Sequence, residues 1–570
     1  MAQPLRADEV QACPHRVALV RGAPVEPVRA EEPASLARRR ERALAHRRAV
    51  LAALAELHPE AARPRSVAET VAALERGDEL VLSPRLPVDL VGRRIASVQA
   101  LVRTGRENRF SYAPVVVKNH EVAEPAATRT LWRAELARPR RADAERVVGV
   151  GARTSSPMTR SGLALAHATR VLGALGHGDP VARGAVVDRG RTLWWLELAG
   201  DAHPRFNLAA YDRLYDERRA VLEAHDAWRE GAGDFPTQPF WHRECPECPF
   251  APHCGAELAA RDDVSLVRFT TSAQQARLRG AGVTTRRALA LLDPDEARRA
   301  REGVPGADGP AAALGREVEH LDQLIYRARV AVDGALRRRV EPEAMGCARA
   351  DVEVDIDMES YEDATYLWGA VVSLARPVPG VTSGYHAEAT FESLTPAGEA
   401  ALFARFWAWL EGVRTACEDA GATFCAYCFW ATAEDGAMDR AVARTEDEAL
   451  ARALGEGVAS FRRARPARWV DLHDVVSRQI QTDGPLGLKL VARAAGFDWR
   501  DPSPSGEASI AWYERAVGDD ADADAHRRRL LEYNEDDCRA TRALRDWLEG
   551  DARALPHRDE PPAPSRPEAS

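Results

Sequence analysis

The sequence predicts an α/β protein of several domains, and three observations support this prediction. The chain has 570 residues, more than one hydrophobic core usually serves, so at least two domains are expected. A β-branched run at residues 110–122 and an amphipathic helical stretch at 161–176 indicate mixed strands and helices in the N-terminal half. From about residue 340 strand and helix patterns alternate again, beyond a proline-containing cysteine loop at residues 245–254.

These patterns divide the chain into four expected parts. Short helical segments without strand patterns separate the two α/β regions, and the last residues are polar and rich in proline, which is typical of disorder. We therefore expect an N-terminal α/β domain over 1–258, a helical linker with a faint helix-hairpin-helix pattern over 259–335, a C-terminal α/β domain over 336–550, and a disordered tail over 551–570.

Composition excludes several classes of protein. The chain contains no apolar run of about 18 residues and no signal-like start, so we expect a cytoplasmic protein without membrane contact. The net charge of −9 gives no global sign of nucleic-acid binding. Only two of the 78 basic residues are lysines, Lys118 and Lys489, and neither follows a glycine, which excludes a Walker A loop.

Four cysteines are the first candidate site. Cys245, Cys248 and Cys254 form a C-x2-C-x5-C run whose intervening prolines oppose a helix, and Cys13 stands far upstream. Reduced thiols in a cytosolic protein bind metal more often than they form disulfides. The pattern predicts a four-thiolate site for an iron–sulfur cluster or for zinc, with buried, inert cysteines as the alternative.

An acidic strand is the second candidate. Residues 351–360 alternate strictly, which places Val352, Val354, Ile356 and Met358 on one face and five carboxylates on the other: Asp351, Glu353, Asp355, Asp357 and Glu359. Such a face belongs either to an edge strand exposed to solvent or to a site for a divalent cation, since Mg²⁺ prefers carboxylate oxygens.

A late helix favours the metal site. In residues 530–548 one continuous stripe contains Tyr533, Asp537, Ala540, Leu544 and Trp547, so Asp537 lies on the face that should be buried. A buried carboxylate without a partner is costly, and a metal ion would be a suitable partner.

The strand and the helix together resemble ribonuclease-H-like 3′–5′ exonucleases of the DEDD type, tyrosine subclass. Asp357 and Glu359 match the first motif, Asp537 the last, and Tyr533 the water-positioning tyrosine, while Glu434 is the best match for the second acid. The resemblance implies that these four carboxylates bind two Mg²⁺ or Mn²⁺ ions and that phosphodiester bonds are hydrolysed there.

The N-terminal half is similar to iron–sulfur nucleases of the RecB type, which have a restriction-endonuclease-like fold. The resemblance implies that Cys13, Cys245, Cys248 and Cys254 hold a [4Fe–4S] cluster that staples the ends of the domain, with zinc as the alternative. His46 matches the metal-site histidine of that family and Lys118 its signature lysine.

The acids that belong with His46 and Lys118 are missing. Gln99 and Val116 stand at their positions, and neither side chain replaces a carboxylate ligand, so we expect a degenerate site. A shifted strand that recruits Glu121 is the alternative.

Taken whole, the chain resembles RecB-like nucleases that fuse such an iron–sulfur domain to a C-terminal ribonuclease-H-like domain. The resemblance implies a nuclease acting on nucleic acid, with DNA carrying a single-stranded end as substrate and a helicase as a candidate partner. A non-catalytic nucleic-acid-binding scaffold with both sites decayed, or a zinc-stabilised interaction protein, would share much of the pattern.

Overall fold

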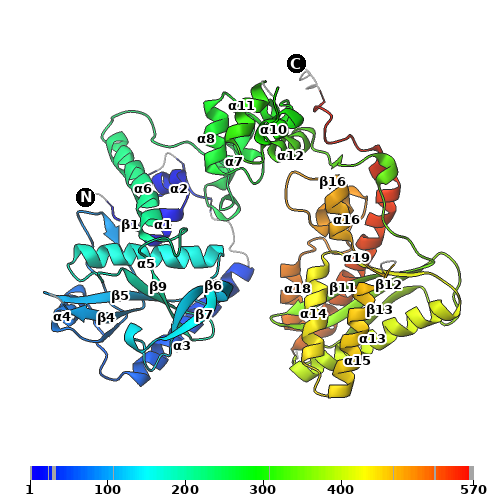
Figure 1. Cartoon of the computed structure of the whole chain (residues 1–570), viewed down its shortest axis with the longest axis horizontal. Helices are drawn as coiled ribbons and strands as arrows, with labels where there is room; N and C mark the ends of the chain where they lie inside the picture. Colours follow the sequence, from blue (N-terminus) through cyan, green and yellow to red (C-terminus); the bar gives the residue numbers. More distant parts are fainter. Residues whose placement is uncertain are drawn as a thin grey trace. The chain divides into compact units, whose positions relative to one another are not determined.

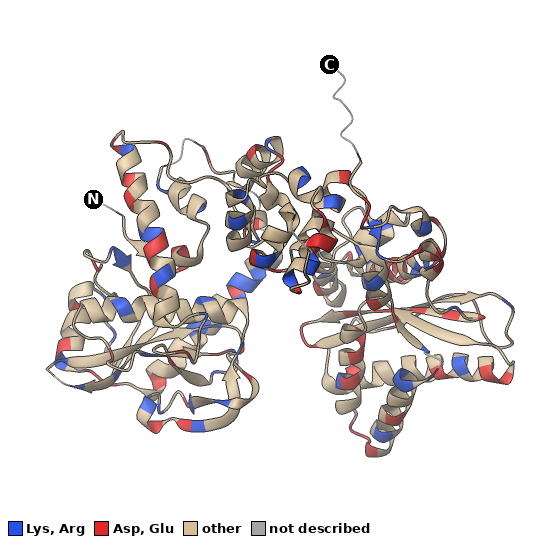
Figure 2. Cartoon of the chain, turned by 45° about the horizontal axis from the view of Figure 1, so that its top comes forward, with Lys and Arg blue, Asp and Glu red and all other residues tan. Residues whose placement is uncertain are grey.

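The computed structural model describes residues 3–22, 25–28, 34–106, 108–306, 309–465, 468–518 and 521–563. The chain forms two compact units, Met1–Leu258 and Ala259–Ser570 (Figure 1). Acidic and basic residues are interspersed over both units, as Figure 2 shows. None of the described helices combines the length and apolarity that crossing a bilayer requires.

The N-terminal unit is built on a seven-stranded sheet. Its strands, in spatial order, are β2 (Leu80–Leu82), β4 (Ala100–Arg106), β5 (Phe110–Val117), β8 (Arg183–Val187), β9 (Leu193–Glu197), β6 (Ala123–Ala134) and β7 (Glu145–Ala152). The neighbours β5 and β8 run parallel, and the other neighbouring pairs are antiparallel.

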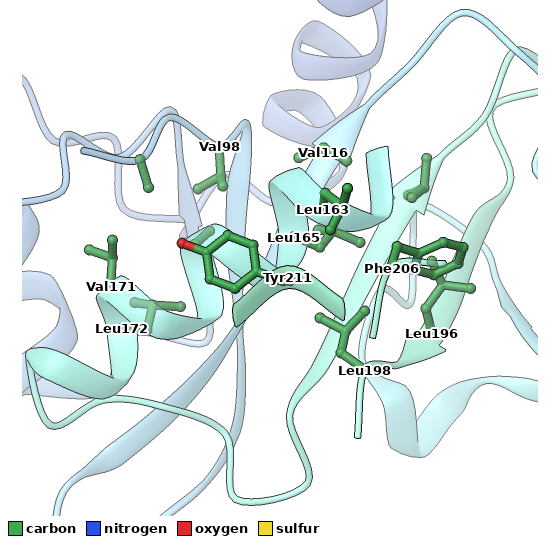
Figure 3. Close-up of a cluster of buried hydrophobic side chains, with 14 of the residues drawn as sticks. Val98, Val116, Leu163, Leu165, Val171, Leu172, Leu196, Leu198, Phe206 and Tyr211 are labelled. Carbon is green, nitrogen blue, oxygen red and sulfur yellow. The ribbon is translucent and has the colours of Figure 1, made fainter. Parts of the chain in front are cut away.

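Helices cover both faces of this sheet. The long helix α5 (Ser156–Ala174) packs on one face, where Val116 joins Leu163 and Leu165 in the hydrophobic cluster shown in Figure 3. Helix α3 (Ala34–Leu57) packs on the other face, where Val50 and Leu54 share a cluster with Val115 and Val117. The remaining elements are β1 (Leu5–Arg6), α1 (Ala7–Gln11), α2 (Pro14–Val20), α4 (Val67–Arg76), β3 (Arg94–Ile95), α6 (Leu208–Arg229) and α7 (Ala251–Ala260).

The C-terminal unit begins with five short helices around their own core. They are α8 (Ser272–Gly280), α9 (Arg286–Ala290), α10 (Pro294–Arg301), α11 (Pro310–Glu317) and α12 (Leu321–Asp333). Strand β10 (Arg337–Arg338) follows and pairs with β16 (Ile480–Gln481) of the α/β part. The stretch 259–335, which we expected to be a linker, therefore belongs to the same compact unit as the α/β region.

A five-stranded sheet forms the centre of this unit. Its spatial order is β13 (Gly384–Ala389), β12 (Ala364–Leu374), β11 (Val352–Tyr361), β14 (Phe424–Cys428) and β15 (Trp469–Asp471). Strand β12 is antiparallel to both of its neighbours, β13 and β11, whereas β14 and β15 continue the sheet parallel to β11. The acidic strand β11 is thus central and largely buried, so the interpretation as a solvent-facing edge strand is wrong.

Each face of β11 contacts a different set of helices. The apolar residues Val352, Val354 and Ile356 face a cluster formed with α13 (Pro396–Asp419), α14 (Ala431–Ala443) and α15 (Glu448–Arg463). Helix α19 (Ala523–Glu549) packs on β11 and β12, together with α17 (Leu488–Ala494) and α18 (Gly506–Val517). Helix α16 (Leu472–Gln479) completes the unit. The alternation of β11 therefore turns its acids toward α19.

The expectation of a disordered tail is wrong for residues 551–563. A short helix (Asp551–Ala554) leads into a segment whose carbonyl oxygens at His557 and Glu560 accept hydrogen bonds from the buried guanidinium of Arg337, at 3.0 and 2.6 Å. Tyr326 also donates its hydroxyl to Asp559 at 2.8 Å. Contacts with distant side chains thus order a segment whose composition is typical of disorder. Residues 564–570 lie outside the described chain.

Candidate metal centre and active site

Strand β11 and helix α19 bring three of the predicted carboxylates together. Asp357 and Glu359, two residues apart on β11, share the face that meets α19, and Asp537 projects from the buried stripe of α19. One carboxylate oxygen from each of the three residues lies within 4.8 Å of the corresponding oxygens of the other two. Among the described residues, no other three His, Cys, Asp or Glu side chains come this close together. Three carboxylates at this spacing match the oxygen ligands that Mg²⁺ and Mn²⁺ prefer.

Asp357 is positioned by an amide. Asn534 donates its Nδ2 hydrogen to Asp357 Oδ2 at 2.9 Å, and the hydroxyl of Tyr385 donates to Asn534 Oδ1 at 2.8 Å. Sequence reasoning missed both residues. Asn534 stands three residues before Asp537, so its position on the same helical face was the signal that could have identified it.

The other two carboxylates each accept from a neutral donor that lies outside β11 and α19. Trp499 donates its indole N–H to Asp537 Oδ1 at 2.7 Å, and Ser509 donates its hydroxyl to Glu359 Oε2 at 3.1 Å. Both donors come from the segment between the predicted motifs, and no local pattern marked them. Each carboxylate therefore keeps oxygen lone pairs available for a cation.

Burial and mutual repulsion shift the titration of the three acids. Burial, followed by the charges of Asp537 and Glu359, raises the pKa of Asp357 well above its ordinary value. Burial and Asp537 raise the pKa of Glu359 to about 8. Burial also raises the pKa of Asp537, although Lys489 opposes the rise. A fully ionised triad is thus costly for the protein alone, and a divalent cation would relieve that cost, so these residues fit the implied metal.

A lysine and a tyrosine line the same site. Lys489 donates its ammonium to the hydroxyl oxygen of Tyr533 at 2.6 Å, and its Nζ lies 3.8 Å from Asp537 Oδ1. Burial and the charge of Asp537 raise the pKa of Tyr533, so the phenol stays protonated. The hydroxyl, which already accepts from Lys489, is left to donate its own hydrogen toward Asp537 or a water molecule. The ammonium of Lys489 is thus engaged with Tyr533, beside the triad.

Glu434, the predicted second-motif acid, stands apart from the triad. It lies in the first turn of α14, is 3% exposed, and its Oε2 has no hydrogen-bond partner in the described chain. Burial raises its pKa to about 8, and its charge contributes to the raised pKa of Asp357. A buried oxygen without a partner near the triad is a suitable additional ligand for a cation.

Helix α14 begins from a strained residue. Trp430 has a φ of 83°, in the left-handed region that asparagine tolerates better than a bulky side chain does. Its backbone N–H donates to Asp471 Oδ1 at 3.0 Å, and its ring stacks on His473. The carboxylate of Asp471 thus holds the start of α14. Helix α14 begins there despite this strain, with Glu434 in its first turn.

The remaining acids of β11 have a built-in partner. The buried guanidinium of Arg545 contacts both carboxylates, with Nη2 donating to Asp355 Oδ2 at 2.6 Å and Nη1 donating to Glu353. The expectation of one continuous acidic metal face is therefore corrected, because only Asp357 and Glu359 remain for the site. Asp536 points away from it and accepts from Arg500 at 2.8 Å.

The N-terminal unit has no equivalent acidic cluster among its described residues. Gln99 Oε1 accepts the backbone N–H of Val117 at 2.9 Å, and Val116 is 2% exposed within the cluster of Figure 3. The alternative acid, Glu121, forms ion pairs with Arg153 and Arg189 instead. Neither Gln99 nor Val116 offers a carboxylate oxygen to a metal ion.

The four predicted cysteines Cys13, Cys245, Cys248 and Cys254 line one small cavity of this unit. Burial raises the pKa of Cys245 to about 11 and that of Cys254 to about 12, so the metal-free thiols are protonated. No three sulfurs of the described chain lie within 4.8 Å of one another. Tetrahedral zinc with Zn–S bonds of about 2.3 Å would hold them about 3.8 Å apart, so the cysteines form no closed zinc site as they stand.

Comparison with known proteins identifies part of the C-terminal unit. A model of the RNase_H superfamily matches residues 448–549, a range that contains Lys489, Tyr533 and Asp537 but not β11. No curated protein and no solved structure matches the chain. The C-terminal part therefore carries a ribonuclease-H-like domain, a nuclease-type fold in which divalent metals are used, within a mixed α/β protein of more than one domain.

Proposed function

We propose that the C-terminal site is a metal-dependent 3′–5′ exonuclease that hydrolyses phosphodiester bonds of nucleic acid, with single-stranded DNA ends as its substrate. The observation that carries the proposal is the convergence of Asp357, Glu359 and Asp537 within 4.8 Å, since Asp537 belongs to the stretch that the RNase_H superfamily model matches. Lys489 and Tyr533 add a cation and a hydroxyl beside these acids.

Each residue of the site has a distinct role. Asp357, Glu359 and Asp537 hold the cations, and Glu434 supplies a further carboxylate. When bound, two Mg²⁺ or Mn²⁺ ions activate water and stabilise the leaving oxygen. Asn534 keeps Asp357 in its rotamer, and the Tyr533 hydroxyl orients the attacking water through the hydrogen that Lys489 leaves free.

For the N-terminal unit we propose a degenerate RecB-like nuclease fold that binds nucleic acid and carries a [4Fe–4S] cluster. Four thiols around one cavity support this proposal, since Cys13 precedes α2 and the other three follow α6, near the two ends of the unit. A cluster suits their wide spacing better than zinc does, because each thiolate binds a different iron instead of one shared ion. We also propose that this protein has a helicase as a partner.

A non-catalytic scaffold is the second candidate function. Glu434 favours it, because this acid stands outside the group formed by the other three. A decayed site would bind nucleic acid without cutting it in any divalent metal.

The deciding experiment follows 5′-labelled single-stranded DNA and RNA with Mg²⁺ or Mn²⁺, for the wild type and for Asp537→Asn. The asparagine retains an oxygen for the Trp499 hydrogen bond but loses the charge. Asp546→Asn, at an exposed position of the same helix, is the matched control. We expect a ladder that shortens from the 3′ end in the wild type and in the control and vanishes in Asp537→Asn. An unchanged ladder in Asp537→Asn would remove the assignment, and binding without any cleavage would establish the scaffold.

A further inference from the structure

One tryptophan of the C-terminal unit is unusually exposed. The chain has 13 tryptophans, all of them among the described residues, and Trp430 is 53% exposed whereas the others are buried or half-buried. Trp430 directly precedes α14, and its φ of 83° lies in the left-handed region that a bulky side chain rarely adopts. An exposed indole on a strained backbone costs free energy, and such strain is concentrated at functional sites.

A carboxylate and an imidazole hold this indole in place. Asp471 Oδ1 accepts the backbone N–H of Trp430 at 3.0 Å and that of His473 at 2.9 Å, so one oxygen ties the start of α14 to the start of α16. The imidazole of His473 stacks on the indole, with the ring centroids 4.8 Å apart and the ring planes inclined by 30°. Phe429 packs edge-on against the same imidazole at 5.5 Å. The indole is therefore supported by a second ring, while more than half of the residue stays open to solvent.

The register of the sheet places this indole beside the triad. Strands β11 and β14 run parallel, and Asp355 is paired in register with Tyr427. Asp357 lies two residues beyond this level on β11, and Trp430 lies three residues beyond it after β14. Neighbouring strands are about 4.8 Å apart, so the start of α14 adjoins the acidic end of β11. Glu434, one helical turn after Trp430, also contributes to the raised pKa of Asp357.

The helix that carries His473 lies on the acidic face of the sheet. Helix α16 shares a hydrophobic cluster with Tyr427 of β14 and with Leu544 and Trp547 of α19. Since α19 packs on the face of β11 that carries the acids, α16 lies on that face as well. The stacked rings of His473 and Trp430 therefore flank the place where the proposed substrate is held.

We propose that Trp430, supported by His473, is a stacking platform for an unpaired base near the 3′ end of the substrate strand. The inference rests on the proposed function and deepens it, because it names the feature of the strand end that the site selects. Every nucleobase offers an apolar face to an aromatic ring, so the platform tolerates any sequence. A base inside a duplex is already stacked on its neighbours, so only an unpaired end can use the platform.

The test measures the binding of 5′-fluorescein-labelled single-stranded DNA to the full chain by anisotropy, in EDTA, where the metal-dependent cleavage proposed above cannot occur. Trp430→Asn removes the ring and introduces a residue that tolerates the left-handed backbone, so its melting temperature should be no lower than that of the wild type. Trp430→Phe retains a ring that can stack. Phe269→Asn is the matched control, because Phe269 is also exposed, at 57%, and also has a positive φ, 64°.

We expect Trp430→Asn to bind the oligonucleotide about 5- to 150-fold more weakly than the wild type does. Trp430→Phe should retain most of the affinity, and Phe269→Asn should bind like the wild type. Oligonucleotides with a single abasic site, moved one position at a time from the 3′ end, identify the stacked base. At one position the abasic site should weaken binding to the wild type by the same factor and leave binding to Trp430→Asn unchanged. A blunt duplex should bind equally to both proteins.

Three results would overturn the inference. The first is an affinity of Trp430→Asn within about twofold of the wild type. The second is an equal loss in Trp430→Phe and Trp430→Asn, since the position and not the ring would then matter. The third is a loss in Trp430→Asn that is the same for every abasic oligonucleotide and for the duplex, because Trp430 would then act without stacking on a base.

The outcomes also separate the platform from the exonuclease. If Asp537→Asn loses cleavage while Trp430→Asn binds and cleaves like the wild type, the platform is refuted and the exonuclease stands. If Asp537→Asn cleaves normally but Trp430→Asn loses affinity only for strands that carry the base, the exonuclease assignment fails and the platform stands.

Discussion

The contact between Lys489 and Tyr533 leads to a prediction that can be worked out from the geometry. Replacing Lys489 by Met removes a charge 3.8 Å from Asp537 Oδ1 and the donor to the Tyr533 hydroxyl. At an effective dielectric constant of about 20 the charge pair alone would be worth about 4 kcal/mol. The lysine side chain is 32% exposed, so solvent screens part of this energy. A hydrogen bond to a charged group retains about 1.5–3 kcal/mol, which corresponds to a rate loss of about 10- to 150-fold.

The assay separates positioning from metal binding. Single-turnover cleavage is measured at pH 9 over a range of Mn²⁺ concentrations for the wild type, Lys489→Met and Lys489→Arg. We expect the maximal rate to fall in Lys489→Met, while the Mn²⁺ concentration at half-maximal rate stays equal or becomes lower, because the triad has lost a neighbouring positive charge. Arg493→Gln, at an exposed position of the same helix, removes the same charge and serves as the control.

Two results would refute this reasoning. A maximal rate within twofold of the wild type would show that Tyr533 needs no lysine. A loss that saturating Mn²⁺ fully restores would show that Lys489 acts on metal binding and not on the tyrosine.

Three further predictions concern stability and cofactors. Burial raises the pKa values of the triad acids, that of Glu359 to about 8, so ionising these acids without metal costs stability as the pH rises from about 4.3 toward 8. The increase in Tm that Mn²⁺ gives over EDTA should therefore grow across this pH window and level off above it. An equal increase in Tm at pH 5 and pH 9 would contradict the metal site. Arg545→Met should lower the free energy of unfolding by about 3–5 kcal/mol in urea titrations, since it strands the buried Asp355, while Glu353 keeps its ion pair with Arg349. Adding Asp355→Asn should recover much of the loss, and a loss below about 1 kcal/mol would mean that the buried charges of Asp355 and Arg545 are not coupled. Anaerobically purified protein should contain iron and acid-labile sulfide in equal amounts, which Cys254→Ser should lose, whereas stoichiometric zinc in the wild type would exclude the cluster.

The strand β11 shows how far the sequence predicts this site. Its alternation correctly separates an apolar face from an acidic face, because side-chain direction in a strand depends only on residue parity. The pattern could not divide the acids further, since the partner of Asp355 is Arg545, 190 residues away in the sequence. Likewise the helical stripe correctly placed Asp537 on the buried face of α19. The hydrogen bonds of Trp499 and Ser509 to the site could not be predicted, because they depend on how distant segments pack and not on a local sequence pattern.

Long-range partners also explain the remaining differences. Residues 551–563 are held in place because Arg337 supplies donors to carbonyl groups of this segment, and composition carries no information about such a donor. Lys489 was singled out because lysine is rare in this chain, yet its contact with Tyr533 depends on how α17 packs beside α19. Residue type and periodicity therefore identified candidates, and the fold decided which of them meet.

The acids of β11 are neutralised in two different ways, and this difference has a functional consequence. Asp355 is paired with Arg545, and Glu353 is paired with both Arg545 and Arg349, so their cations are part of the chain and cannot leave. Asp357 and Glu359 face Asp537 instead and require an exchangeable cation. A chelator should therefore abolish the chemistry of the triad and leave the ion pairs of Arg545 intact.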